Sequence, residues 1–145
     1  MSIWRTPASV EQLQAFSRNT LVDTIGIRVT EIGPDFVRLT MPVNPTVHQP
    51  TGVLHGGASV ALAETAGSLA ANMCVDSRRY LCLGQEINAN HLRPVQAGIV
   101  TATARPIHIG KRSHVWSIEI RDEHEKLVCI SRLTMAVVER ARDVP

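Results

Sequence analysis

The chain has 145 residues, a length that suits one folded domain with a buried core. Hydrophobic residues make up 44% and charged residues 19%, and the formal net charge of +2 is too small to indicate binding to nucleic acid or to a membrane surface. Only 3% of the residues are aromatic, so the chain also lacks the stacking platform of a single-strand-binding protein.

The first predicted elements are a helix and a β-hairpin. Ser9 is the expected N-cap of a helix over about 9–20, because Gln12 stands at the capping-box position. The segments IRVTEI and FVRLTMPV flank Gly33, Pro34 and Asp35, which are typical turn residues. In the second segment, apolar residues alternate with Arg and Thr, as in a half-buried strand.

The segment 56–75 predicts one long helix, made mostly of small residues, with Glu64 as its single charged side chain. Three or four strands are expected after it, with 81–92, 98–109, 114–122 and 127–138 as the candidate segments. One long helix among consecutive strands indicates an α+β fold, a single domain over 1–145 in which an antiparallel sheet wraps around the helix. The helix lacks a polar face, so we expect it to be buried nearly all round. Although it is long enough to cross a membrane, its small residues and Glu64 argue against this.

Glu64 is the strongest candidate for chemistry, because carboxylates are rarely buried unless they are paired or functional. Ser68 follows one helical turn later and could bond a water or a carboxylate oxygen beside Glu64. Gly56 and Gly57 lie in the first turn, where backbone N–H groups can stabilise an oxyanion. Structural alternatives stay open: an ion pair for the carboxylate, a packing role for the serine, and a tight turn for the glycines.

Further candidates are polar or basic residues, or a turn glycine, in loops and at strand ends: Gln49, His55, His91, Arg93, His108, Gly110, Lys111 and Arg112. Lys111 and Arg112 could bind phosphates, although a solvated basic turn is an equal alternative. The histidines lack the spacing of a helical metal motif, so no metal site is predicted. The stretch GASVA lacks the last glycine of a nucleophile elbow, which argues against a nucleophilic Ser59.

The cysteines and the start of the chain bear on where the protein works. Cys74, Cys82 and Cys129 are scattered, odd in number and form no C-x-x-C pair, which argues against a disulfide framework or a zinc site. The first residues contain no apolar stretch typical of a secretory signal. We therefore expect a cytoplasmic protein.

Three segments, HQPTGVLHGGASVALAETAGS, NANHLRPV and HIGKR, occur in the order found in hotdog-fold thioesterases, and the chain resembles this family over roughly 21–138. Within this family it resembles 1,4-dihydroxy-2-naphthoyl-CoA hydrolases and, nearly as closely, the proofreading thioesterases of enterobactin synthesis. A Glu at position 64, where the phenylacetate branch has an Asp, favours the aroyl-CoA group of the Arthrobacter type. The resemblance implies dimers or tetramers with active sites at subunit interfaces. It implies no metal or redox cofactor, with CoA entering as part of the substrate.

The resemblance also implies roles for single residues. Glu64 matches the catalytic carboxylate, acting as nucleophile or as base for water, and Gly56 matches the backbone oxyanion donor. Gln49 and His55 match residues that orient the thioester, and Ser68 matches one that places the water or the carboxylate. The positions near the CoA arm are His91 and Arg93, with His108, Gly110, Lys111 and Arg112 as weaker matches.

The expected function is therefore hydrolysis of an aromatic or related acyl-CoA to the free acid and CoA. Three alternatives remain open: a proofreading thioesterase acting on an aryl or acyl carrier protein, a hotdog hydratase or dehydratase in which His55 carries the chemistry, and a CoA-ester-binding module without turnover.

Overall fold

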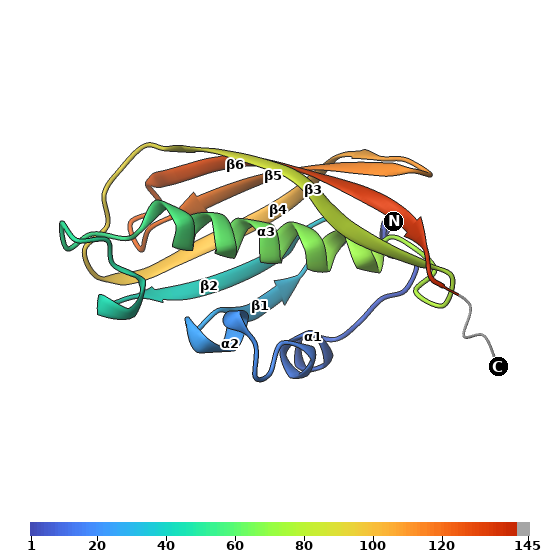
Figure 1. Cartoon of the computed structure of the whole chain (residues 1–145), viewed down its shortest axis with the longest axis horizontal. Helices are drawn as coiled ribbons and strands as arrows, with labels where there is room; N and C mark the ends of the chain where they lie inside the picture. Colours follow the sequence, from blue (N-terminus) through green and yellow to red (C-terminus); the bar gives the residue numbers. More distant parts are fainter. Residues whose placement is uncertain (142–145) are drawn as a thin grey trace.

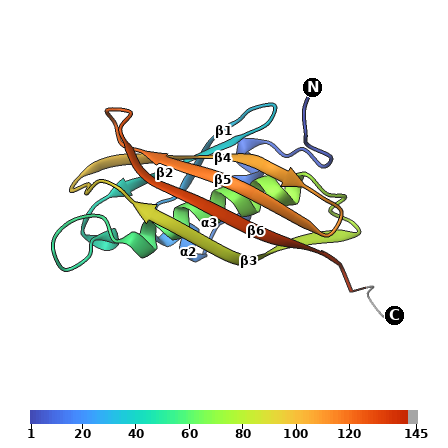
Figure 2. The ribbon, with the colours of Figure 1, turned by 90° about the horizontal axis from the view of Figure 1, so that it is seen from above.

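The computed structural model describes residues 1–141, which form a curved antiparallel sheet with one long helix across its inner face (Figures 1 and 2). The strand order is β1-β2-β4-β5-β6-β3. The predicted α+β architecture is confirmed, and the last four residues of the predicted domain lie outside the described range. The elements are α1 (Val10–Phe16), α2 (Leu21–Thr24), β1 (Arg28–Ile32), β2 (Val37–Val43), the 3₁₀ helix η1 (Pro45–Val47), α3 (Gly56–Met73), β3 (Tyr80–His91), β4 (Gly98–Ile109), β5 (Ser113–Arg121) and β6 (Leu127–Glu139).

The strands follow from the alternation of apolar and polar residues. In β2, Val37, Leu39 and Met41 are completely buried, while the residues between them are partly exposed. The side chains of a strand point alternately to its two faces, so one face of β2 packs on α3 and the other faces outward. The Gly33 N–H donates to the Phe36 carbonyl at 2.9 Å and closes the turn between β1 and β2, which confirms the predicted hairpin.

Small residues let α3 lie close to the sheet. Ala63, Ala66 and Ala70 have no exposed surface, and a Cβ built on Gly67 would lie 2.6 Å from the Leu133 Cδ2 of β6. The helix ends at Met73, two residues before the predicted end, with Cys74 as its C-cap. The expectation of burial nearly all round is wrong for the single chain, because Glu64 and other residues of the opposite face keep partial exposure.

The N-terminal segment differs from the single helix predicted over about 9–20. The capping box of Ser9 and Gln12 is present, but α1 ends at Phe16 and a separate short helix, α2, follows. Asn19 has a φ of +58°, a left-handed conformation that interrupts a right-handed helix. After the break, α2 contacts α3, whereas α1 packs against β1, and the two short helices lie side by side in Figure 1.

β3 is an edge strand of the sheet. It pairs with β6 along its whole length, from Tyr80 opposite Glu139 to His91 opposite Cys129, and its other side has no strand partner within residues 1–141. β3 begins near the C-terminal end of α3 and finishes near the start of that helix (Figure 1). The two ends of this edge therefore lie beside the two ends of the helix.

Candidate active site

The loop before α3 is held tightly by its own backbone. The Gln49 N–H donates to the Val53 carbonyl at 2.8 Å, and the Gly52 N–H donates to the Gln49 carbonyl at 2.9 Å. Gly52 has a φ of +79°, a left-handed conformation that favours glycine. The amide of the Gln49 side chain donates to the Thr51 hydroxyl at 2.8 Å. Gln49 therefore has a fixed place a few residues before the helix.

His55 is the N-cap of α3. Its Nδ1 accepts a hydrogen bond from the Gly57 N–H at 2.8 Å, which satisfies one of the donors at the helix start. A neutral ring that accepts through Nδ1 carries its proton on Nε2. His55 lines a cavity of about 280 Å³ with Gly57 and Ala61, separate from the cavity that contains Gly56. Gln49 and His55 are both predicted to orient the thioester, but within one chain they line different cavities.

Gly56 and His91 are in close contact at the start of α3. A Cβ built on Gly56 would lie 2.8 Å from the His91 Nε2, closer than real Cβ atoms approach other groups. Gln49, Gly56, His91 and Arg93 all line one cavity of about 270 Å³. The Arg93 guanidinium donates to the Leu127 carbonyl at 2.7 Å, which fixes it at the rim. The structure thus brings four of the predicted site residues together at the positive end of the helix dipole.

Glu64 and Ser68 share a second cavity, of about 310 Å³, on the outer face of α3. The remaining lining comes from the α1–α2 segment and from α3 itself: Phe16, Ser17, Thr20, Val22, Thr65 and Leu69. The Ser68 hydroxyl lies 3.8 Å from the Met135 sulfur and donates to it, rather than to the carboxylate of Glu64. Glu64 is half-buried, so its carboxylate lies at the boundary between the protein and the cavity.

The oxyanion candidate and the carboxylate candidate lie apart within one chain. Gly56 and Glu64 are eight positions apart on α3, which corresponds to about 12 Å along the helix axis. They line different cavities, Gly56 the one at the start of α3 and Glu64 the one on its outer face. One chain by itself therefore does not place Gly56 and Glu64 around the same reacting atom.

The basic turn between β4 and β5 is separated from His91 and Arg93. Gly110 and Lys111 line a cavity of about 470 Å³ together with Cys74, at the C-terminal end of α3. His108 folds over Gly110, since a Cβ there would lie 2.5 Å from the His108 Nε2. Figure 1 places this hairpin and the start of α3 at opposite ends of the molecule. The structure therefore divides the predicted CoA-binding residues into two groups.

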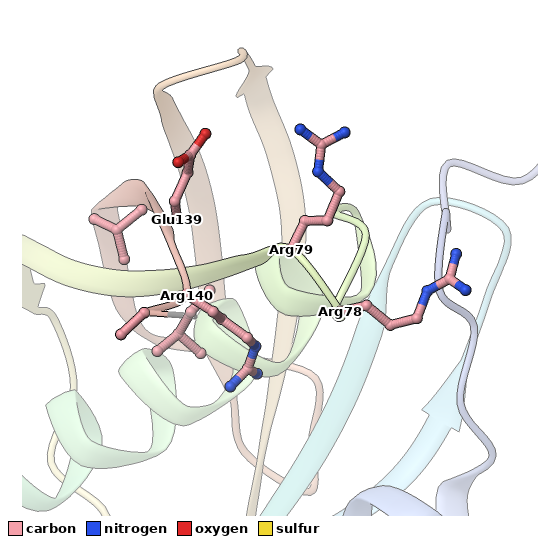
Figure 3. Close-up of a pocket in the computed structure, with 7 residues that line it drawn as sticks. Arg78, Arg79, Glu139 and Arg140 are labelled. Atoms are coloured by element: carbon pink, nitrogen blue, oxygen red, sulfur yellow. The ribbon is translucent and has the colours of Figure 1, made fainter. Parts of the chain in front are cut away.

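A cavity of about 710 Å³ is lined by Arg78, Arg79 and Arg140 and contains none of the predicted site residues. Figure 3 shows that the three side chains point in different directions. Arg78 pairs with Asp76 at 3.4 Å, and the Arg140 Nε donates to the Ser77 carbonyl at 2.7 Å. Because their guanidinium groups diverge, these arginines do not form a shared site for one anion.

Comparison with known proteins identifies the family. The profile of the family described as "Thioesterase superfamily" matches residues 51–129. The chain belongs to the thioesterase superfamily. A thioesterase of Pseudomonas aeruginosa, solved as a glutamine-to-alanine variant, superposes with a TM-score of 0.94 at 48% identity, over 96% of this chain and 100% of the other. The 1,4-dihydroxy-2-naphthoyl-CoA hydrolase of Escherichia coli is 44% identical over 94% of this chain and 99% of its own length. A proofreading thioesterase of Cronobacter turicensis is 44% identical over 94% and 98%.

The cysteines of this hotdog thioesterase are not poised to act as nucleophiles. All three are buried, and burial raises the pKa of the Cys74 thiol to about 12 and that of the Cys82 thiol to about 11. A nucleophilic cysteine needs the thiolate form, which these values disfavour. Among residues 1–141 of the thioesterase, no three His, Cys, Asp or Glu side chains come together at a metal-binding distance. None of the helices in that range has the length and apolarity needed to cross a membrane.

Sequence reasoning missed two kinds of residue in this thioesterase. Phe16 and Leu69 line the cavity beside Glu64, but they come from separate elements, and no local pattern links them. Gly84 in β3 lies directly under the Glu64 carboxylate, because a Cβ on that glycine would approach Oε1 to less than 3.0 Å. An isolated glycine inside a strand signals a bulge or a close approach, and that signal was available in the segment LCLGQEIN.

Proposed function

We propose that this thioesterase hydrolyses an aromatic or related acyl-CoA to the free carboxylic acid and CoA, with Glu64 and the Gly56 N–H as its central catalytic groups. The observation that carries the proposal is the position of Glu64. It is the one charged residue in the sequence of α3, and it is half-buried in a cavity whose lining includes Phe16, Val22 and Leu69. Such a cavity suits an acyl group, with the carboxylate at its edge.

The chemistry requires an oxyanion donor and an attacking oxygen. The Gly56 N–H at the start of α3 would stabilise negative charge on the thioester carbonyl oxygen. Glu64 would either attack the carbonyl carbon, giving an anhydride that water then hydrolyses, or remove a proton from the attacking water. On either route the carbon–sulfur bond breaks, the thiolate of CoA takes up a proton, and water supplies the new acid oxygen. No metal or redox cofactor enters this mechanism.

A homodimer would join the two halves of the site. The free edge of β3 offers backbone groups for pairing with β3 of a second subunit, and a twofold axis makes such a pairing antiparallel. The start of one β3 would then lie beside the end of the other. Because β3 runs from one end of α3 to the other, the Gly56 cavity of one subunit would approach the Glu64 cavity of its partner. Pairs of dimers would give the expected tetramer.

The same arrangement would reunite the predicted CoA-binding residues. In an antiparallel dimer, the β4–β5 hairpin of one subunit would come close to the helix start of the other. Lys111 and Arg112 would then supply positive charge near the His91 and Arg93 of the partner subunit, where they could bind phosphates of CoA. Gln49 and His55 would orient the thioester, and Ser68 would place the attacking water or the carboxylate.

The second candidate function differs from the first in the carrier of the acyl group, which is CoA in one and a carrier protein in the other. The E. coli relative is named as a CoA-ester hydrolase and the Cronobacter relative as a proofreading thioesterase, and both are 44% identical to this chain. We favour CoA as the carrier and keep an aryl or acyl carrier protein as the alternative. We place the activity in the cytoplasm, because the cysteines are free thiols and thiols persist in a reducing compartment.

Glu64→Gln tests the proposal. This variant keeps the shape of the side chain but removes both the nucleophile and the base. We expect kcat for aroyl-CoA hydrolysis, followed as release of free thiol, to fall by a factor of about 10²–10⁴, with KM changed only a few-fold. A panel of aroyl-CoA, fatty acyl-CoA and aroyl carrier-protein thioesters, compared by kcat/KM, identifies the substrate class.

Glu123→Gln serves as the matched control, because it makes the same change at an exposed turn between β5 and β6. This control should retain normal turnover. Near-normal turnover of Glu64→Gln would show that the carboxylate is dispensable and would refute the mechanism. Hydration of an enoyl-CoA without thiol release would identify a hydratase instead, and binding of every thioester without turnover would identify a binding module.

A further inference from the structure

The carboxylate of Glu64 lies against the inner face of β3 at Gly84. A Cβ built on Gly84 would come within 3.0 Å of the Glu64 Oε1 and within 3.6 Å of its Cδ. The next neighbour is the Leu133 Cδ1, at an ordinary 3.9 Å. The conflict therefore involves the carboxylate and nothing else close by.

Gly84 is held in this place by an irregularity in the sheet. In the pairing of β3 with β6, Gly84 lies opposite Met135 and Glu86 lies opposite Thr134, so Gln85 is an extra residue on β3. A bulge of this kind changes which side chains face the core. Cys82 is buried before the bulge, whereas Ile87 and Ala89 pack against the core after it. Gly84 is therefore the last inward-facing position before the bulge, after which the odd-numbered residues face the core instead of the even-numbered ones.

Backbone conformation does not explain the glycine. The positive φ angles among the glycines in residues 1–141 belong to Gly26, Gly52 and Gly98, so Gly84 has a conformation that alanine can also adopt. Glycine inside a strand weakens it, because glycine loses more conformational freedom on folding and packs no side chain. Within the described chain, the space that Gly84 leaves is occupied by the Glu64 carboxylate.

We propose that Gly84 is a positioning residue, whose missing side chain allows the Glu64 carboxylate to lie against β3, the edge strand of the sheet. The proposal rests on the proposed catalytic role of Glu64. Adding a methyl group would displace the carboxylate, because Glu64 ends a flexible side chain while Leu133 is fully buried and fixed by packing. A shift of about 1 Å in a reacting group can cost a factor of about 10² in rate.

Gly84→Ala tests the proposal directly. We expect kcat to fall about 10- to 100-fold with KM within about 3-fold of wild type, because binding groups are untouched and the reacting group moves. The midpoint of thermal unfolding should not fall, since alanine suits a strand better than glycine. Ala89→Val is the control, because it enlarges another inward-facing residue of β3 beyond the bulge and should leave kcat near wild type.

Glu64→Asp provides the decisive second variant, since its carboxylate is withdrawn by one methylene group and no longer reaches Gly84. In the Glu64→Asp background, Gly84→Ala should reduce kcat by less than about 3-fold. Equal losses in both backgrounds would show that Gly84 does not act through Glu64 and would overturn the proposal. Full activity of Gly84→Ala alongside an inactive Glu64→Gln would also overturn it, while leaving the proposed function intact. Gly84→Ala alone could fail to fold. In that case the double variant Gly84→Ala/Glu64→Asp must fold and have the kcat of Glu64→Asp, or the proposal is wrong.

Discussion

The contact between Gly67 of α3 and Leu133 of β6 gives a quantitative test of how the helix is held. In Gly67→Ala, the new methyl group would lie 2.6 Å from the Leu133 Cδ2 and 3.5 Å from the Ile118 Cδ1. Carbon atoms in contact normally lie about 3.5–4.0 Å apart, so the Leu133 methyl or the helix must move by about 1 Å. Forced packing of this kind costs about 1–3 kcal/mol.

Helix propensity acts in the opposite direction. Replacing glycine with alanine inside a helix stabilises it by about 1 kcal/mol, so the net destabilisation of Gly67→Ala should be between about 0 and 2 kcal/mol. Because this net value is small, the sharper quantity is the coupling with Leu133. In the wild-type background, Leu133→Ala should cost about 2.7–5 kcal/mol, because it leaves a cavity in the core.

The double variant distinguishes the two effects. In Gly67→Ala, Leu133→Ala should cost at least about 1 kcal/mol less, because it removes the clash and the new methyl group partly fills the cavity. The assay is urea unfolding of all four proteins at one fixed protein concentration, since association would otherwise alter apparent stability. Costs that add to within about 0.5 kcal/mol would show that the helix does not rest on Leu133 and would refute the packing described above.

Two further predictions concern buried titratable groups. Burial lowers the pKa of His114, so the unfolded chain takes up a proton below about pH 6.5 that the native protein does not, and stability should fall as the pH falls from 7 to 5. His114→Gln should flatten this slope, by at most about 1.4 kcal/mol per pH unit, whereas substitution of the exposed His124 should not. Because burial raises the pKa of Cys74 to about 12 and of Cys82 to about 11, iodoacetamide at pH 8 should label these thiols after unfolding and leave them unlabelled in the native protein. Rapid labelling of the native protein would contradict the burial of these thiols.

Much of the fold could be predicted because its signals are local. Alternation in β2, turn residues between β1 and β2, and the capping box at Ser9 each lie within a few neighbouring residues, and each was confirmed. The break after Phe16 was not predicted, because it depends on Asn19 adopting a left-handed conformation that its sequence neighbours do not require.

The candidate site was predictable in its residue types but not in its grouping. Gln49, Gly56, His91 and Arg93 meet in one cavity, whereas the turn at 110–112 lies at the other end of α3. The topology of the sheet explains this separation. β3 ends near the helix start, and β4, which runs antiparallel to β3, then leads away from the helix start for up to about 40 Å of extended chain. The contact of Glu64 with β3 lies beside a one-residue bulge. The isolated Gly84 signals a bulge or a close approach, but it does not say which side chain of another element fills the space.

The attachment of β3 also sets an order in time. Within the described residues, β3 is joined to the sheet through β6 alone. β6 comes later in the chain than β3, because β3 ends at His91 and β6 begins only at Leu127. During synthesis, β3 can therefore pair into the sheet only after β6 has been made. The contact between Gly84 and the Glu64 carboxylate can be fixed only then as well. A chain that stops before Leu127 can form the hairpin of β4 and β5 but leaves β3 without its strand partner, so the proposed site cannot be completed until β6 has been synthesised.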